Sequence, residues 1–514
     1  MVFGKIRLST FLIILGLVAL FFVTRLTNIL SLPIFTDEAI YVRWSQIAKQ
    51  DAAWRFISLT DGKQPLFIWI AINIMRFVSD PLLAARLVSV FAGFGAMLGV
   101  MVLSLELFKK KRTGGIINRM FGQFLEDKRF AYITGLMFIV FPFALVLDRM
   151  AMYDSLVACT MVWALYAEVL LVRYMRLDIA LLAGVIMGSA VLTKTSGFFS
   201  IYLLPFSLLL FDFKQKEWKK KLFEWLIYAG IASAVAYGMY SVLRLSPFFY
   251  IIDEKNALFV YPFQEWIRHP LEFLYGNFNA LLGWFFVYTT IPVLLFALTS
   301  FFIGKNLREK LLLLVWFLAP FTALGIFGKT LYPRFIFFMT VPVILLASFA
   351  VITLMQRFKS RVISIVILLL VLSFSVYADY FIIFNISKAP IPQADLGQYI
   401  NSWPAGGGVR EMVAFFEKEA KKGSIYVATQ GTFGSLPTNS MEIYLGENKN
   451  IETRGIYPLP SQVPADLKKL AQTMPVYYVF NDSEYAPEDW PVTLVGKFQK
   501  GNGDRHLSIY SVNP

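Results

Sequence analysis

The sequence has little charge for its length and almost no cysteine. Of its 514 residues, 16% are charged and 57% are hydrophobic, whereas about a quarter of the residues of a soluble globular protein are charged. The single cysteine, Cys159, excludes an intrachain disulfide and a metal cluster held by several thiolates. The sequence also contains no Walker A motif and no GxGxxG motif, so it gives no support for soluble nucleotide chemistry. These absences favour an integral membrane protein.

Long apolar runs occupy the first three quarters of the chain. A helix needs about 20 apolar residues to cross a bilayer, and we predict such helices at 9–31, 83–108, 130–147, 151–172, 178–194, 197–212, 223–245, 277–303, 311–327, 335–355 and 362–385. The sequence therefore predicts a polytopic α-helical membrane protein with about eleven transmembrane helices. A shorter apolar stretch, 64–78, is interpreted as re-entrant or interfacial.

Basic residues are concentrated in short loops between these runs. The chain has 48 Lys and Arg against 34 Asp and Glu, which gives a net charge of +14. The basic segments are 109–129, 173–176, 214–221, 305–310 and 356–361. Because cytoplasmic loops carry an excess of Lys and Arg, we expect the N-terminus to be cytoplasmic. An odd number of spans then places the C-terminal region on the extracytoplasmic side of the cell membrane.

Hydropathy falls after the last apolar run. Residues 386–408 contain prolines and a run of three glycines, so we predict a linker there, between a transmembrane catalytic domain at 1–385 and an extracytoplasmic domain at 409–514. In the last segment, apolar residues have helical spacing at 409–422, whereas 424–429, 475–480, 492–498 and 507–512 have the composition of strands. We therefore expect a small C-terminal α/β domain.

Two adjacent carboxylates, Asp37 and Glu38, follow the first apolar run. An acid at the end of a span is often only a solvated interfacial residue, and this interpretation stays open. At a cavity, however, a carboxylate deprotonates and orients a hydroxyl acceptor, and aspartate is ordinarily ionised at neutral pH. The functional interpretation is favoured because the other candidate residues fall on the same predicted face.

A second acidic group lies at the turn between two predicted spans. The stretch "LDRMAMYDSLV" contains Asp148, Arg149 and Asp154. Arg149 and Asp154 are candidates for a structural ion pair, and Asp154 is also suited to the N-terminus of the following helix. The alternative is that Asp154 faces a cavity at the outer ends of the spans.

Several cations occupy the same predicted face. Lys63 lies in "DGKQPLFIW", Lys194 in "LTKTSG", and Lys329 and Arg334 in "GKTLYPR". Any one of them is explained as an interfacial residue whose charged end reaches water. Two or three cations around one cavity would instead bind a phosphate ester, and the planar guanidinium of Arg334 is suited to bidentate contacts.

These motifs resemble those of the GT-C membrane glycosyltransferases. The similarity is to the branch containing dolichyl-phosphate-mannose protein mannosyltransferases and the aminoarabinose transferases that modify lipid A. It is carried by "FTDEAIYVRWSQIA", "GKQPLFIW", "DRMAMYDSL", "LTKTSGFF" and "LYPRFIFFMTVPVILL", and it extends over roughly residues 10–355. The resemblance implies transfer of a sugar, with inversion, from a polyprenyl-phosphate carrier to an acceptor on the extracytoplasmic face.

The resemblance also implies roles for the acidic residues. Asp37 matches the first acidic residue of the family and would act as general base or orient the acceptor, with Glu38 in support. Asp154 matches the second acid beside the cavity. These three residues are the predicted catalytic residues.

The predicted donor-binding residues are cationic. Lys63 matches the family's phosphate-binding lysine, and Arg149, Lys194 and Arg334 would complete the contacts with the phosphate. The sequence departs from the family pattern at Gln64, where the family has the first of two prolines, so the turn that presents Lys63 is expected to differ.

The expected partners are a polyprenyl-phosphate sugar, a lipid, glycan or protein acceptor, and membrane lipids, with no nucleic acid. A phosphate is a competent leaving group, so cations serve the donor and a carboxylate serves the acceptor. This chemistry requires no obligatory cofactor and no metal site, although it is compatible with a divalent metal ion. The main alternative is a transporter or flippase of lipid-linked sugars, which would place acids within its spans and show an internal repeat. A membrane anchor for the C-terminal domain and a ligase or polymerase of longer glycans are further alternatives.

Overall fold

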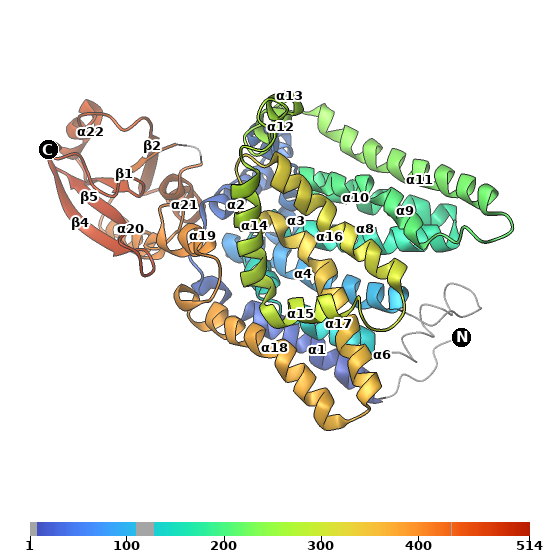
Figure 1. Cartoon of the computed structure of the whole chain (residues 1–514). Coiled ribbons are helices and arrows are strands. Elements are labelled where there is room, and N and C mark those ends of the chain that lie inside the picture. Colours follow the sequence, from blue (N-terminus) through green and yellow to red (C-terminus); the bar gives the residue numbers. More distant parts are fainter. Residues whose placement is uncertain (1–7, 109–127, 433) are drawn as a thin grey trace. The chain divides into compact units, whose positions relative to one another are not determined.

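The computed structural model of the chain describes residues 8–108, 128–432 and 434–514 (Figure 1). It divides into two compact units. The helical unit consists of Met1–Thr27, Phe56–Phe67 and Arg86–Ile383, and the C-terminal unit consists of Asn28–Arg55, Ile68–Ala85 and Phe384–Pro514. Two segments from the first quarter of the sequence therefore belong to the same unit as the C-terminal region. The domain boundaries expected at residues 385 and 408 stay a prediction.

Helices make up the helical unit. In chain order these are α1 (Leu8–Leu26), most of α4 (Pro81–Phe108), α6 (Lys128–Ile139), α7 (Pro142–Asp148), α8 (Tyr153–Tyr174), α9 (Leu177–Thr193), α10 (Phe199–Tyr202), α11 (Trp218–Ser241), α12 (Ile251–Asn256), α13 (Phe263–Trp266), α14 (Leu274–Thr289), α15 (Ile291–Thr299), α16 (Leu307–Phe327), α17 (Phe337–Phe358) and most of α18 (Arg361–Phe384). Short 3₁₀ helices include η3 (Ile57–Asp61), η4 (Thr195–Phe198), η5 (Leu204–Leu210) and η7 (Pro333–Ile336).

The chain is an integral membrane protein by the length and composition of these helices. Among the described residues, seven helices are long and apolar enough to cross a membrane, or up to nine if each of two bent pairs is one span. Two further apolar segments, Leu177–Thr193 and Thr195–Leu210, are shorter than this. The eleven predicted runs all fall on these segments, so the polytopic helical class is confirmed, whereas the number of eleven crossings stays a prediction. The predicted basic segment 109–129 lies outside the described residues except for its last two positions.

Prolines accompany both bends. The pair α6 and α7 bends by 63°, with Pro142 at the start of α7, and the pair α14 and α15 bends by 94°, with a proline in the first turn of α15. Proline lacks a backbone N–H and its ring clashes with the preceding turn, so a helix ends before it. At the second bend Thr290 has a φ of 62°, a conformation that turns the chain between the two helices.

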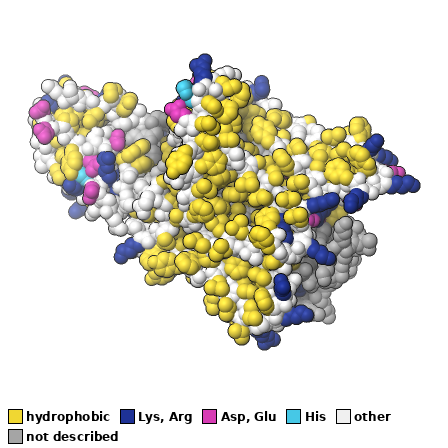
Figure 2. Space-filling model, in the orientation of Figure 1, with side chains coloured by type: hydrophobic (Ala, Val, Ile, Leu, Met, Phe, Trp, Pro, Cys, Tyr) yellow, Lys and Arg dark blue, Asp and Glu magenta, His cyan; other side chains and the backbone are white. Residues whose placement is uncertain are grey.

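The helices differ in how much of their surface is buried. α8 and α17 are almost completely buried in the unit, whereas the most apolar windows of α1, α11 and α18 are mostly exposed. Figure 2 shows hydrophobic side chains over the outward faces of α14, α15 and α16. Exposed hydrophobic side chains of α14 and α15 are Leu282, Phe286, Ile291, Leu295 and Leu298, among others. An apolar exterior of this extent fits a lipid environment.

The C-terminal unit contains helices and one mixed sheet. Its helices are α2 (Thr36–Gln50), most of α3 (Leu66–Ile74), α19 (Gln393–Leu396), α20 (Val409–Ala420), α21 (Leu436–Leu445) and α22 (Ala465–Ala471). Its strands are β1 (Ile425–Gln430), β2 (Ile451–Ile456), β3 (Val476–Phe480), β4 (Val492–Gln499) and β5 (His506–Val512). The nine-residue α3 is too short to cross a bilayer as a helix.

The sheet has the strand order β2-β1-β3-β5-β4. β1 pairs in parallel with β2 and β3, and β5 pairs antiparallel with β3 and β4. An apolar core that includes Tyr478, Phe480 and Trp490 packs on the sheet. The small C-terminal α/β domain is thus confirmed, with the predicted helix at α20 and the four predicted strands at β1, β3, β4 and β5.

Candidate active site

An ion pair joins the ends of two helices of the helical unit. Asp154 is the second residue of α8, and Lys194 follows the last residue of α9. The Lys194 Nζ lies 2.8 Å from Asp154 Oδ1, and it also lies 4.7 Å from the centre of the Phe335 ring. Asp154 is buried and its carboxylate is at the positive end of the α8 dipole. Asp154 therefore has Lys194 as an ionic partner. The candidate ion pair between Asp154 and Arg149 is not needed to explain the burial of the Asp154 carboxylate.

The turn that carries Lys63 is fixed by hydrogen bonds and a glycine. Gln64 Nε2 donates to Thr195 Oγ1 at 2.9 Å, which ties this turn to the one that carries Lys194. Gly62 has a φ of +64°, and a Cβ there would lie 2.6 Å from the carbonyl oxygen of Ile251. Gln64, the departure from the family pattern, thus has a structural role in this chain.

Three predicted cations of the helical unit act on one another. Burial lowers the pKa of Lys194 from its ordinary value, Asp154 opposes this shift, and the like charges of Arg334 and Lys63 add to it. Arg334 lies in η7, is buried, and has its guanidinium 4.5 Å from the centre of the Tyr332 ring. The Arg334 guanidinium also lies 5.8 Å from the centre of the Phe335 ring, the ring that Lys194 approaches at 4.7 Å. The hydrogen bond between Gln64 and Thr195 ties the Lys63 turn to the same place, so the three cations lie near one another, beside Asp154.

Sequence reasoning missed a second carboxylate beside these cations. Asp61 Oδ2 lies 3.3 Å from Lys63 Nζ, and Asp61 Oδ1 lies 2.6 Å from Lys255 Nζ. Asp61 comes two residues before Lys63 in the quoted "DGKQPLFIW" motif, but Lys255 is almost 200 residues away, and no spacing pattern indicates it. The three side chains form a charged chain between the Lys63 turn and α12.

A buried ion pair supports the start of α8. Arg25 Nε lies 3.2 Å from Asp148 Oδ2, and both side chains have no exposed surface. Ser155, the residue after Asp154, donates from Oγ to Asp148 Oδ1 at 2.8 Å. Asp148, which the sequence places beside Arg149 and Asp154, thus holds the first turn of α8 to α1.

Arg149 is buried against α1. Its side chain is 1% exposed and Nη1 donates to the carbonyl oxygen of Thr24 at 3.1 Å. This contact belongs to the interior of the helical unit. The role of Arg149 in phosphate binding stays a prediction.

Asp37 and Glu38 belong to the first turn of α2 in the C-terminal unit. Glu38 is buried, and its Oε2 accepts a hydrogen bond from the backbone N–H of Phe35 at 2.9 Å. The carboxylate of Glu38 therefore caps its own helix, whereas Asp37 is partly exposed. Glu38 thus stabilises the N-terminus of α2, whereas the part of both acids in the reaction stays a prediction.

Metal-ligating side chains do not gather in the part of the chain that the structure describes. No group of three or more His, Cys, Asp or Glu side chains there is arranged to hold a metal ion. That the reaction proceeds without an obligatory metal ion or cofactor stays a prediction.

Several solved structures are similar to this chain. Crystal structures of ArnT from Cupriavidus metallidurans, bound to undecaprenyl phosphate and in the apo state, each align at 15% identity with a TM-score of 0.55, over 98% of this chain and 99% of theirs. The archaeal oligosaccharyltransferase AglB from Archaeoglobus fulgidus, in complex with an inhibitory peptide and a dolichol-phosphate, aligns at 13% identity with a TM-score of 0.48, over 92% of this chain and 69% of AglB. No family model and no curated protein matches the sequence. The chain therefore has the GT-C fold of membrane glycosyltransferases such as ArnT, as its motifs predict.

Proposed function

We propose that this protein is an inverting glycosyltransferase that moves a sugar from a polyprenyl-phosphate carrier to a hydroxyl or phosphate acceptor. The observation that carries the proposal is that Lys63, Lys194 and Arg334 lie near one another beside Asp154 in the helical unit. With Lys255, the group has four cations against two paired carboxylates, Asp61 and Asp154. It therefore retains a net positive charge, which suits a phosphate group at the end of a lipid chain.

The chemistry follows from the charge that develops on the leaving group. The acceptor oxygen forms a bond to the anomeric carbon while the bond from that carbon to the phosphate oxygen breaks, and the phosphate leaves with both bonding electrons. The cations stabilise this departing charge without a proton transfer. A single displacement of this kind inverts the configuration of the sugar.

Asp37 is the residue we assign to the acceptor. As general base it takes the proton of the attacking hydroxyl group, and a carboxylate suits this task at neutral pH. Asp37 lies in the first turn of α2, where the helix dipole favours an ionised carboxylate. Glu38 supports it by capping the same turn.

The similarity to ArnT supports a lipid-linked donor. The ArnT crystal structure is bound to undecaprenyl phosphate and shares the fold of this chain over almost the full length of both. We further propose that the reaction takes place on the extracytoplasmic face, with the N-terminus in the cytoplasm, because the basic loops predict that orientation.

The experiment that tests the proposal measures the release of polyprenyl phosphate. Purified protein receives a panel of polyprenyl-phosphate hexoses and pentoses together with crude membrane acceptors. We expect release with at least one donor by the wild type and its loss in Asp37→Asn. Asp51→Asn, which changes an exposed acid just after the other end of α2, is the matched control and should remain active.

Two outcomes would overturn the proposal. If the wild type releases no polyprenyl phosphate from any donor but moves lipid-linked sugars across vesicle membranes, the protein is a transporter. If Asp37→Asn is folded and as active as the wild type, Asp37 has no part in the reaction.

A further inference from the structure

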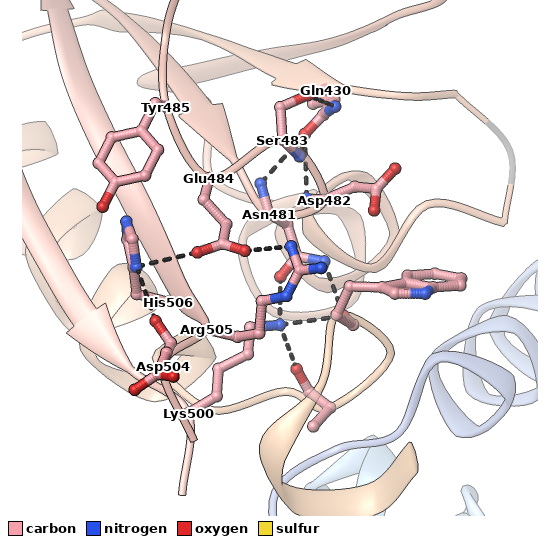
Figure 3. A network of polar contacts seen from close by, with 12 residues as sticks. Gln430, Asn481, Asp482, Ser483, Glu484, Tyr485, Lys500, Asp504, Arg505 and His506 are labelled. Carbon is pink, nitrogen blue, oxygen red and sulfur yellow. Dashed lines mark hydrogen bonds and ion pairs between the residues drawn. The ribbon is translucent and has the colours of Figure 1, made fainter. Parts of the chain in front are cut away.

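A buried lysine of the C-terminal sheet holds the linker that precedes α20. Lys500 follows β4 and has no exposed surface. Its Nζ donates to the carbonyl oxygens of Trp403 at 3.0 Å and Ala405 at 2.5 Å, and to Asn481 Oδ1 at 2.6 Å (Figure 3). The three N–H groups of the ammonium thus have three acceptors, two of which are backbone atoms of the linker.

Neighbouring groups fix this lysine in place. Asn481 follows β3, and its Nδ2 donates to the same Trp403 carbonyl at 2.9 Å. Glu484 pairs with Arg505 and with His506, whose Nδ1 lies 3.1 Å from Glu484 Oε2. Figure 3 shows these charged groups beside Lys500. Burying an ammonium group costs free energy unless it is hydrogen-bonded. The buried Lys500 therefore depends on the linker carbonyls as acceptors, and the linker depends on Lys500 as donor.

The same stretch of linker holds the start of α2. The carbonyl oxygen of Pro404, between the two carbonyls that Lys500 binds, accepts hydrogen bonds from Thr36 N at 3.0 Å and Thr36 Oγ1 at 2.9 Å. Phe35 forms an antiparallel bridge with Ala405. A Cβ at Gly406 would lie 2.2 Å from the carbonyl oxygen of Ile34, so glycine allows the two segments to approach.

Three consecutive residues, Trp403, Pro404 and Ala405, therefore connect Lys500 to the N-terminus of α2. Lys500 binds the outer two carbonyls and Thr36 binds the middle one. Asp37 is the next residue after Thr36. All of these contacts lie within the C-terminal unit.

We propose that Lys500 is a positioning residue for Asp37, acting through the linker carbonyls that hold the first turn of α2. The inference rests on the proposed function of Asp37, and it gives the C-terminal domain a role in the reaction. A displacement of a reacting group by about 1 Å is sufficient to lower a rate on the order of 100-fold.

The test compares Lys500→Met, Lys500→Arg and Lys497→Met in the full-length protein. Lys500→Met removes the charge and leaves the linker carbonyls without their donor. We expect its kcat for sugar transfer to fall on the order of 10- to 100-fold. The KM for the lipid-linked donor should be unchanged because the donor-binding cations belong to the helical unit.

Two further variants are the controls. Lys500→Arg keeps a cationic hydrogen-bond donor and should recover part of the rate. Lys497→Met makes the same change at an exposed lysine of β4 whose Nζ reaches only the Tyr485 side chain, and it should behave as the wild type.

A second readout does not depend on activity. Hydrogen exchange of the Thr36 amide, which donates to Pro404, should become faster in Lys500→Met and stay unchanged in Lys497→Met. If Lys500→Met does not fold, Thr36→Val replaces it, since this change removes only the Oγ1 hydrogen bond to Pro404 and keeps the volume. We expect about a five-fold fall in kcat from the loss of one such bond.

The outcomes separate this inference from the proposed function. A folded Lys500→Met protein with wild-type kcat and wild-type exchange at Thr36 overturns the positioning role. Lys500→Met is also introduced into the Asp37→Asn protein. If it lowers the residual rate of that protein as much as it lowers the rate of the wild type, the positioning role is overturned, because a residue that acts through Asp37 adds little once the carboxylate is absent. Absence of transfer in the wild type contradicts the proposed function instead, and the exchange experiment still reports whether Lys500 holds the linker.

Discussion

The ammonium group of Lys194 lies 2.8 Å from the carboxylate of Asp154 and joins the end of α9 to the start of α8. Lys194 also interacts with two like charges, Lys63 and Arg334. Asp154 thus holds Lys194 in place against the like charges of Lys63 and Arg334. In the proposed reaction, a phosphate bound there would offset the repulsion on Lys194, which would favour the anionic product.

We expect Lys194→Met to lower kcat/KM for the lipid-linked donor on the order of 100-fold, because it removes a cation from the leaving phosphate. Asp154→Asn should also lower it, by releasing Lys194 from its position. The double variant should be less impaired than the sum of the two changes predicts, since the two residues act as a pair. Steady-state donor cleavage by the four proteins measures this coupling, and strictly additive effects would show that the ion pair has no role.

The sequence indicates Lys63, Lys194 and Arg334 and the carboxylate beside them, Asp154, whereas their roles in the reaction stay predictions. Lys63, Asp154, Lys194 and Arg334 each lie at the end of an apolar run, so the alternation of spans and loops places them on one face. Their neighbour Asp61 was missed because its second partner, Lys255, is far away in the chain. Sequence periodicity carries no information about such pairs.

In the C-terminal domain, too, the sequence predicts some elements and misses others. Four strands and α20 have clear alternation or helical spacing, whereas β2, with the sequence "IETRGI", is a polar strand at the edge of the sheet. The helix α21 was missed, although Ser435 as N-cap and Pro437 in the first turn are signals that favour its start. The hydrogen bonds from Lys500 to the linker could not be predicted, because every residue has a backbone carbonyl and the sequence does not indicate which of them accepts a bond.

The ion pair between Arg25 and Asp148 should be important for stability. Asp148→Asn leaves a fully buried arginine without its anionic partner. We expect a loss of about 3–5 kcal/mol in the free energy of unfolding, seen as a lower melting temperature in detergent. Asp178→Asn, which breaks an exposed ion pair with Arg176, is the control and should change the melting temperature little. Equal melting temperatures for the two variants would contradict the structural role of Asp148.

The turn before Lys63 should not tolerate a side chain. In Gly62→Ala the new Cβ lies 2.5 Å from Lys255 Cβ, and the residue keeps a positive φ. We expect a loss of about 1–3 kcal/mol in stability from the strained backbone and a higher KM for the donor, because the shifted turn displaces Lys63. Gly230→Ala in α11, where the added Cβ meets nothing within 4 Å, should have the stability and the donor KM of the wild type. Donor kinetics and thermal unfolding of the two variants check the prediction, and an unchanged KM in Gly62→Ala would separate the turn from donor binding.

The rate of transfer should depend on the protonation of Lys500. Burial lowers the pKa of Lys500 to about 7, an effect that Glu484 and Asp482 oppose and Arg505 increases. Below this pH the ammonium has three N–H groups for its three acceptors, whereas above it the neutral amine has two, so one acceptor loses its donor.

We therefore expect the wild-type kcat to fall about five-fold, the equivalent of one hydrogen bond, as pH rises through 7. Lys500→Arg should lack this step, because a guanidinium stays charged throughout the range. Initial rates at saturating donor from about pH 5.5 to 9 measure the difference between the two proteins, because an arginine side chain stays charged throughout that interval. Identical pH profiles would show that the proton on Lys500 does not control the position of Asp37.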